Sequence, residues 1–375
     1  MKKIIRLSLL LLTLFLSGFC TEAFGAQAAE GKKDINVSEF VLEHLADSYE
    51  WHITTWNGKP ISVHLPVIVK GKESGWHVFS SERLEEAAHQ GKDYQGFFLS
   101  SEHHNKIYEK LADGTVERPW DLSITKNVLQ IWLVVFILIG TFLYCARWYK
   151  KHDSVKQEAP KGFVGAIEML VMTIHDDVIK SSIGEKHYRP YAPYLLTVFF
   201  FIFTNNLLGL IPIFPGGANV TGNINITLLL AVGTMLAVNL FGNKEYWKEI
   251  LWPNVPLWLK IPPVMPLIEV FGIFTKPFAL MIRLFANMMA GHAIILSFTF
   301  VIFMTWQIST SMGSIFTVFS AVLMIFLNCL ELLVAFLQAY VFVLLSSVFI
   351  GLAHPEHHEE VYCQHSSDCE QQCYV

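Results

Sequence analysis

Long apolar runs alternate with short polar segments through the last two thirds of the chain. Three of these runs, Val128–Cys145, Tyr194–Pro212 and Ile224–Phe241, have the length of a helix that crosses a bilayer. Two further runs, Val264–Met304 and Ile315–Leu352, each contain about forty residues, roughly 60 Å if helical. Because a hydrocarbon core is only about 30 Å thick, each of the two must break or lie strongly tilted. The pattern predicts an all-α polytopic membrane protein with about five membrane helices, of which the last two form a long tilted hairpin.

The segment between the first two spans has a different periodicity. Apolar residues recur at helical spacing from Phe163 to Val178, with Glu168, Asp176 and Lys180 on the opposite side. This pattern predicts an amphipathic helix that lies in the membrane interface.

Basic residues divide the connecting segments into two kinds. The first span is followed by Arg147, Lys150 and Lys151, and lysines recur in 244–260, whereas the segments near 216 and 310 are uncharged. The positive-inside rule therefore places the basic segments in the cytoplasm and the uncharged segments outside it.

The N-terminus has the three parts of a secretory signal peptide. Residues 1–6 are basic, Leu7–Phe19 is an apolar core too short to span comfortably, and 26–28 offer a small-residue cleavage site. Lipidation at Cys20 is rejected because Phe19 stands where a small residue is needed. We therefore expect 1–28 to be a signal peptide and the mature N-terminus to lie outside the cytoplasm.

Residues 29–125 are polar enough for an extracytoplasmic segment of mixed α/β structure. A short helix is expected over 41–49, and two hairpins are expected around Asn57-Gly58 and over Gly71–Gly75. Seven histidines occur in this segment, at positions 44, 52, 64, 77, 89, 103 and 104. Metal binding is conceivable, but their spacings match no standard site. We favour scattered surface histidines and predict no metal.

The remaining divisions are a membrane domain over 126–353 and a polar cytoplasmic tail over 354–375. Three cysteines and His365 in the tail fit no standard zinc spacing, which favours a disordered tail in a reducing compartment. The chain of 375 residues is 53% hydrophobic and 16% charged, which excludes an ordinary soluble protein.

One arginine interrupts the first of the two longest apolar runs. Arg283 is surrounded in sequence by Leu280, Ile282, Leu284 and Phe285. A guanidinium at mid-bilayer costs from about 2.5–3.5 to about 10–17 kcal/mol, and it does not escape by losing its proton. Such a charge indicates an ion path or a carboxylate partner, while a structural salt bridge is the alternative.

Other polar residues are arranged about Arg283 along the predicted hairpin. Glu269, fourteen residues earlier, shares its face within about 40°, and Asn287 extends that face. His292, nine residues later, points to the opposite side.

On the second long helix, Glu331 and Gln338 are seven residues apart on one face, with Asn328 beside Glu331. Ionisable groups thus stand on both sides of Arg283 along the membrane normal. The arrangement suggests two half-paths that meet at a fixed positive charge.

The segments Ile282–His292 and Leu337–Phe342 resemble subunit a of the F-type ATP synthase. The resemblance covers roughly residues 126–353 and includes Glu269, Lys276-Pro277 and Thr204–Pro212. It implies a non-catalytic stator subunit of the Fo motor in a bacterial inner membrane, which couples proton flow to ATP synthesis. The implied partners are the c-ring, b-type peripheral stalk subunits and the lipid bilayer, with no nucleic acid and no cofactor.

The resemblance also implies roles for single residues. Arg283 matches the arginine that faces the c-ring carboxylates, and Glu269 matches the acid of the cytoplasmic half-channel. The outer half-channel would use His292 and Glu331, a pair whose two residue types are exchanged in some members. Where some members carry an acid, this chain has Gly209, so the outer path relies more on that pair and on nearby amides. The implied ion-translocation residues are Arg283, His292, Glu331, Gln338, Glu269, Asn287 and Asn206, with Asn205 beside the last.

Three alternatives remain open from the residues alone. A sodium-translocating form differs from the proton form largely in the c-ring site, which lies in another chain. A self-contained transporter would show internal repeats or paired broken helices, and the sequence shows no such repeat. A structural scaffold would have no use for Arg283, Glu331 and Gln338 together.

Overall fold

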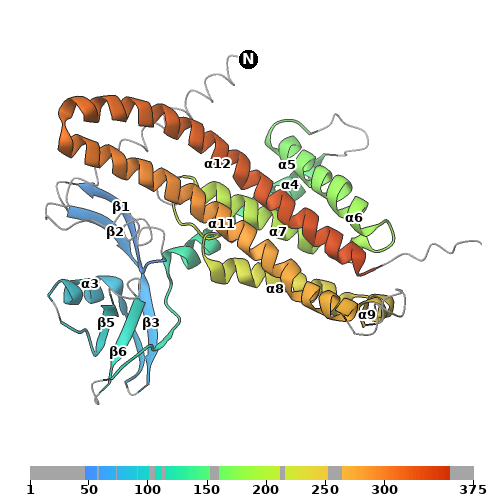
Figure 1. Ribbon diagram of the computed structural model, residues 1–375, viewed down its shortest axis with the longest axis horizontal. Coiled ribbons are helices and arrows are strands. Elements are labelled where there is room, and N and C mark those ends of the chain that lie inside the picture. The colour runs from blue at the N-terminus through green and yellow to red at the C-terminus, as the bar shows by residue number, and fades with distance from the viewer. Residues whose placement is uncertain are drawn as a thin grey trace, which may run out of the picture.

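A computed structural model describes residues 47–56, 59–72, 74–90, 92–100, 106–111, 115–152, 160–211, 216–251 and 264–354. The expected signal peptide, most of the helix expected over 41–49 and the tail from residue 355 lie outside these ranges. Within them, the chain forms a small β-rich domain followed by a bundle of long helices (Figure 1).

In its described residues, the β-rich domain contains three small antiparallel sheets and one helix. The strands are β1 (Glu50–Trp56) paired with β2 (Lys59–His64); β3 (Pro66–Gly71) between β4 (Gly75–Ser80) and β8 (Trp120–Asp121); and β6 (Lys106–Lys110) between β5 (Phe97–Ser100) and β7 (Val116–Glu117). Helix α3 (Ser81–His89) follows β4. Both predicted hairpins are present, whereas α3 and β5–β8 were not predicted.

The core of this domain follows from strand alternation. In β3, Val67 and Val69 point inward and are completely buried, while Lys70 points out. They pack with Phe79, Phe97 and other apolar residues in one cluster.

Among the described residues, five helices are long and apolar enough to cross a membrane, which confirms the predicted fold class. They are α4 (Lys126–Lys151), α7 (Tyr188–Gly209), α8 (Ile224–Phe241), α11 (Val264–Ile308) and α12 (Thr310–Leu352). Helix α9 (Lys244–Leu251) follows α8. Helix α8 matches its predicted run, and α4, α11 and α12 extend a few residues beyond theirs because polar residues at a helix end remain helical while facing the interface. Helix α7 begins at Tyr188 instead of Tyr194 and ends at Gly209 instead of Pro212.

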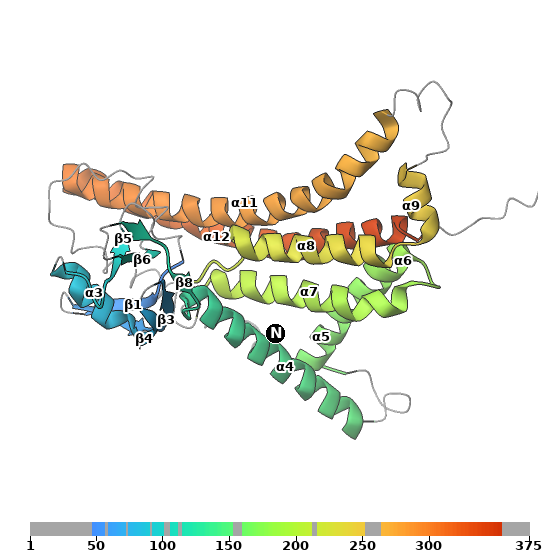
Figure 2. The ribbon, with the colours of Figure 1, turned by 90° about the horizontal axis from the view of Figure 1, so that it is seen from below.

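The two longest helices form an unbroken antiparallel hairpin. Helix α11 has 45 residues and α12 has 43. Neither helix breaks in two, so of the two expected arrangements the strongly tilted one remains. Figure 2 shows α11 and α12 side by side for most of their length and α11 bending away near α9. Pro277 lies inside α11, and a proline is the usual cause of such a bend.

The turn of this hairpin is shorter than predicted. Only Ser309 separates the helices, so Ser311 and Gly313, which lie between the two predicted apolar runs, belong to α12. A Cβ on Gly313 would come within 2.9 Å of the Trp306 ring, which explains the glycine as packing space. The indole N–H of Trp306 donates to the Thr317 hydroxyl across the turn (2.9 Å).

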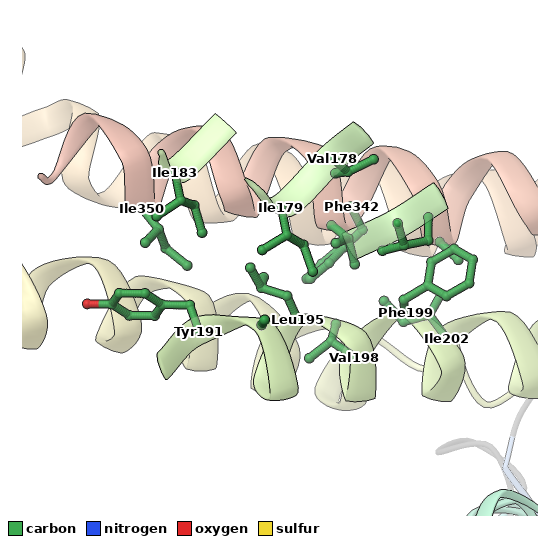
Figure 3. Close-up of a cluster of buried hydrophobic side chains, with 14 of the residues drawn as sticks. Val178, Ile179, Ile183, Tyr191, Leu195, Val198, Phe199, Ile202, Phe342 and Ile350 are labelled. Carbon is green, nitrogen blue, oxygen red and sulfur yellow. The ribbon is translucent and has the colours of Figure 1, made fainter. Parts of the chain in front are cut away.

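The predicted amphipathic helix is present but its apolar face is used differently. It consists of α5 (Phe163–Met172), a π-helical segment η3 (Thr173–Lys180) and α6 (Ser181–Ile183). Ile174, Val178 and Ile179 are completely buried in the main core with residues of α7 and α12 (Figure 3). Protein therefore covers the apolar face of η3, while the location of the whole helix in the membrane interface stays a prediction.

The two ends of the bundle differ in their neighbours. The β-rich domain and the α11–α12 turn lie at one end (Figures 1 and 2). At the other end, the Asn243 N–H donates to the Ala353 carbonyl (3.0 Å), and Tyr191 hydroxyl lies 3.3 Å from His354 Nε2.

Candidate ion pathway

His292 and Glu331 come together where α11 packs on α12. Nδ1 of His292 lies 3.4 Å from Oε1 of Glu331, and the Glu331 side chain is only 6% exposed. Within the described part of the chain, both Glu331 carboxylate oxygens and His292 Nε2 are buried without a hydrogen-bond partner. Three such atoms at one place are unusual, because buried polar groups are nearly always hydrogen-bonded. His292 and Glu331 therefore form a buried polar site between two apolar helices.

Two glycines make room for this pair. A Cβ on Gly291 would lie 2.7 Å from Glu331 Oε1, so only glycine allows the carboxylate to approach α11 this closely. At Gly209, the end of α7, an added Cβ would lie 3.6 Å from His292 Nε2. The position where some family members carry an acid thus faces the imidazole in this chain.

Two amide side chains of α7 near this pair make their own hydrogen bonds. Asn206 is completely buried, and its Nδ2 donates to the carbonyl of Ala335 in α12 (3.3 Å). Its Oδ1 accepts from the Thr221 hydroxyl (2.6 Å). The Asn205 side chain instead donates to Phe201 within its own helix (2.8 Å).

Sequence reasoning missed Gln130 in α4, which is completely buried. Its Nε2 donates to the carbonyl of Asn205 (3.5 Å), and its Oε1 accepts from the Ala218 N–H (3.0 Å). Gln130 therefore joins α4 to α7 and to the segment after α7. The signal available was a single glutamine inside an apolar run.

The start of α4 continues these polar groups into the β-rich domain. Asn127 is buried, and its backbone N–H donates to Asp47 Oδ1 (3.3 Å). The charge of Lys126 lies close enough to Asp47, Glu50 and His292 to act on all three. Neither residue was a sequence-predicted site residue.

Arg283 has a different environment from the histidine. Its side chain is exposed on α11, as is Asn287 one turn later, whereas Gln338 on α12 is buried. In the described ranges, Arg283 makes no ion pair and no hydrogen bond. The exposed residues on its side of the same helix include Ala279, Ala286 and Ala290, and Ile282 beside it is also exposed. The guanidinium thus stands on an open apolar surface inside the span Leu267–Gln307.

Glu269 lies at the opposite end of α11 from the hairpin turn. Burial, and then the negative charge of Glu269, raise the pKa of the Tyr246 hydroxyl in α9. That hydroxyl donates to Asn239 Oδ1 in α8 (3.4 Å). Glu269 therefore belongs to a second polar group, formed by α8, α9 and α11, that is separate from the His292–Glu331 pair.

The fold and these two polar groups define a class: a multi-pass membrane protein with ionisable groups on either side of an unpaired arginine. Comparison with known families agrees with that class. Residues 128–351 match the family "ATP synthase A chain", and 40–125 match a domain of unknown function (DUF8433).

Curated relatives extend the match. The chain is 40% identical over 313 residues to ATP synthase subunit a of Chlorobium phaeobacteroides (strain DSM 266 / SMG 266 / 2430), covering 78% of this chain and 86% of that protein. It is 37% identical over 265 residues to ATP synthase subunit a of Myxococcus xanthus (strain DK1622), covering 68% and 80%. The chain therefore belongs to the ATP synthase subunit a family. As a member, it is a non-catalytic, ion-translocating subunit that works with ring and stalk subunits in the ATP synthase membrane sector.

Proposed function

We propose that Arg283 faces the carboxylates of a c-ring and separates two proton half-channels, through which this subunit couples proton flow to ATP synthesis. The observation that carries the proposal is the exposed, unpaired guanidinium on an apolar surface within a membrane span. A charge in that position requires a counter-charge. Because the described residues of its own chain supply none, the counter-charge comes from another subunit.

The outer half-channel is formed by the His292–Glu331 pair and the amides near it. The pair is separated from Arg283 by nine residues of α11, about 14 Å along the helix. Buried polar atoms without protein partners support a hydrated path at this point, since water satisfies such groups. Asn206 and Gln130 continue the path toward the β-rich domain.

The inner half-channel is formed around Glu269. This residue lies fourteen positions before Arg283, about 21 Å along α11 and on the opposite side from His292. Its charge acts on Tyr246, whose hydroxyl contacts Asn239. These groups give a proton a polar route to the end of the bundle where His354 lies.

The mechanism follows from the fixed charge. A carboxyl group travels through lipid when protonated, and it ionises beside Arg283 because an opposite charge lowers its pKa. The ring then turns only by exchanging protons with the two half-channels. Each charge that crosses the full potential releases about 2.3 kcal/mol per 100 mV.

Protons, rather than sodium ions, suit the outer pair. An imidazole relays protons near neutral pH. Hard cations such as Na⁺ are instead held by oxygen ligands, and His292 supplies nitrogen. A self-contained transporter is not favoured, because it would not leave Arg283 exposed on its outer surface.

The proposed orientation places the β-rich domain and the α11–α12 turn outside a bacterial inner membrane. The C-terminal end of α12, α9 and the lysine-bearing segment after α4 are then cytoplasmic. Positive residues gather at that end, as the positive-inside rule requires. The expected partners are the c-ring against α11 and α12 and b-type stalk subunits elsewhere.

The test is ATP synthesis and passive proton flux in vesicles that carry the complex with variants of Arg283. Arg283→Lys keeps a charge but loses the planar fork, and synthesis should be nearly abolished. Arg283→Ala should abolish synthesis and raise the passive proton leak. Arg147→Ala, the same change at the end of α4, is the matched control and should do neither. Appreciable synthesis by an assembled Arg283→Ala complex would overturn the proposal.

A further inference from the structure

Three potential metal ligands meet in the β-rich domain, outside the ion pathway. Glu50 in β1 and His64 in β2 are cross-strand partners, and Glu85 comes from α3. One ligand atom from each of the three lies within 4.8 Å of the others. Their positions in sequence follow no standard metal spacing, and the fold alone brings them together.

The distances suit a first-row divalent ion. Nε2 of His64 lies 3.4 Å from Oε2 of Glu85. For metal–ligand bonds of about 2.0–2.1 Å, ligand atoms at the corners of a tetrahedron are roughly 3.4 Å apart. A small closing movement of Glu50 brings the third ligand into the same geometry, and all three side chains are only half-buried, so they are free to make it.

The negative charges of the cluster also favour a bound cation. The carboxyl groups of Glu50 and Glu85 lie within hydrogen-bonding distance of each other. Two negative charges this close repel each other, and a divalent cation between them would offset the repulsion. Lys126 interacts electrostatically with Glu50, and it does so with Asp47 as well.

We propose that Glu50, His64 and Glu85 form a binding site for a divalent transition metal ion such as Zn²⁺ or Mn²⁺. Two carboxylate oxygens and one imidazole nitrogen are ligands that both ions accept, and water completes the coordination. The site belongs to the part of the chain that matches a domain of unknown function.

Such an ion would hold two parts of the domain together. The β1–β2 hairpin is a separate two-stranded sheet, and an isolated hairpin is only marginally stable in water. Coordination by Glu85 fastens this hairpin to α3, which packs in turn on β5 and β4. Because the Lys126 N–H donates to the carbonyl of Ser48 (3.0 Å), two residues before Glu50, the ion would also help fix the domain at the start of α4.

The experiment measures metal content of the purified full-length chain in detergent, after chelation and dialysis against Zn²⁺ or Mn²⁺. We expect one ion per chain. Glu85→Gln and His64→Gln should each weaken apparent affinity at least about tenfold. Glu82→Gln, which removes the same charge one turn away, and His77→Gln, whose ring pairs with Gln95 (2.9 Å), are matched controls and should bind like the wild type.

A second measurement does not depend on the variants. Loading the wild-type chain with Co²⁺ should produce ligand-field absorption bands, which disappear on competition with Zn²⁺. Absence of stoichiometric binding and of these bands would overturn the proposal and indicate a shared proton between the carboxyl groups. The proposal would also be overturned if the Glu85→Gln and Glu82→Gln chains bound the metal equally well and circular dichroism showed that both are folded.

Discussion

Gly291 of α11 and Glu331 of α12 approach each other so closely that no side chain fits between them. The position of a Cβ on Gly291 lies 2.7 Å from Oε1 of Glu331, and the next residue is His292, which pairs with the same oxygen. The close approach of the two helices therefore sets the distance between the imidazole and the carboxylate.

Gly291→Ala is expected to separate this pair. The new methyl group displaces the Glu331 carboxylate, and a displaced carboxylate no longer lies beside His292. Proton-driven ATP synthesis should fall by roughly a factor of ten, which corresponds to about 1.4 kcal/mol in barrier height. Gly272→Ala on the same helix is the control, because its Cβ would meet only Lys276 Cε at 3.8 Å. Equal activity of the two variants would contradict the proposed importance of the close approach.

A double-mutant cycle tests whether His292 and Glu331 act as one unit. Each change to alanine should slow proton uptake from the outside, because the other group loses its partner at 3.4 Å. The double variant should be little worse than either single one, with a coupling energy of about 0.5–3 kcal/mol. Exchanging the two residue types should restore part of the flux. Strictly additive losses would mean that the two residues work independently.

The membrane spans could be predicted because each depends only on local sequence. Long apolar runs identify helices without knowledge of their neighbours, and the face of each long helix followed from helical periodicity. The turn of the hairpin was predicted less accurately. A glycine between two apolar runs is typical of a turn, but Gly313 lies in α12, where it makes room for the Trp306 ring.

Contacts between distant segments were not available to the same reasoning. His292 and Glu331 are 39 residues apart, and their distance depends on how α11 crosses α12. Gln130 gave almost no signal, because its partners in α7 and the following segment are known only from the fold. Helix α3 was missed because Leu84 is the only apolar residue that is buried among its described side chains, which leaves almost no apolar periodicity.

Asn206 is expected to stabilise the packing of α7 against α12. Asn206→Leu removes the hydrogen bond to Ala335 and leaves the Thr221 hydroxyl without its partner. The cost should be about 1–2 kcal/mol, the usual range for such bonds between membrane helices. Unfolding in mixed detergent with increasing sodium dodecyl sulfate measures the loss. Asn225→Leu, at an exposed position in α8, is the control and should change stability little.

The orientation is tested by labelling a cysteine placed at Ser311, an exposed residue next to the hairpin turn. A membrane-impermeant maleimide added outside intact cells should label it, because the turn lies at the end of the bundle that carries the β-rich domain. The native cysteines are first replaced by serine, and a cysteine at Lys151 serves as the inside control. Labelling of Ser311→Cys only after permeabilisation would reverse the proposed topology.

Gly209 offers a test of the outer relay by rescue. It ends α7, and the position of its Cβ lies 3.6 Å from His292 Nε2, which has no hydrogen-bond partner among the described residues. In a Glu331→Gln background, Gly209→Asp should place a new carboxylate against the free side of the imidazole and restore part of the proton flux. Gly209→Asn has nearly the same shape but does not carry a proton, so it should restore none. Recovery with asparagine equal to that with aspartate would show that space or packing, rather than a carboxylate beside His292, limits proton access. No recovery with aspartate in a fully assembled complex would likewise place the relay elsewhere.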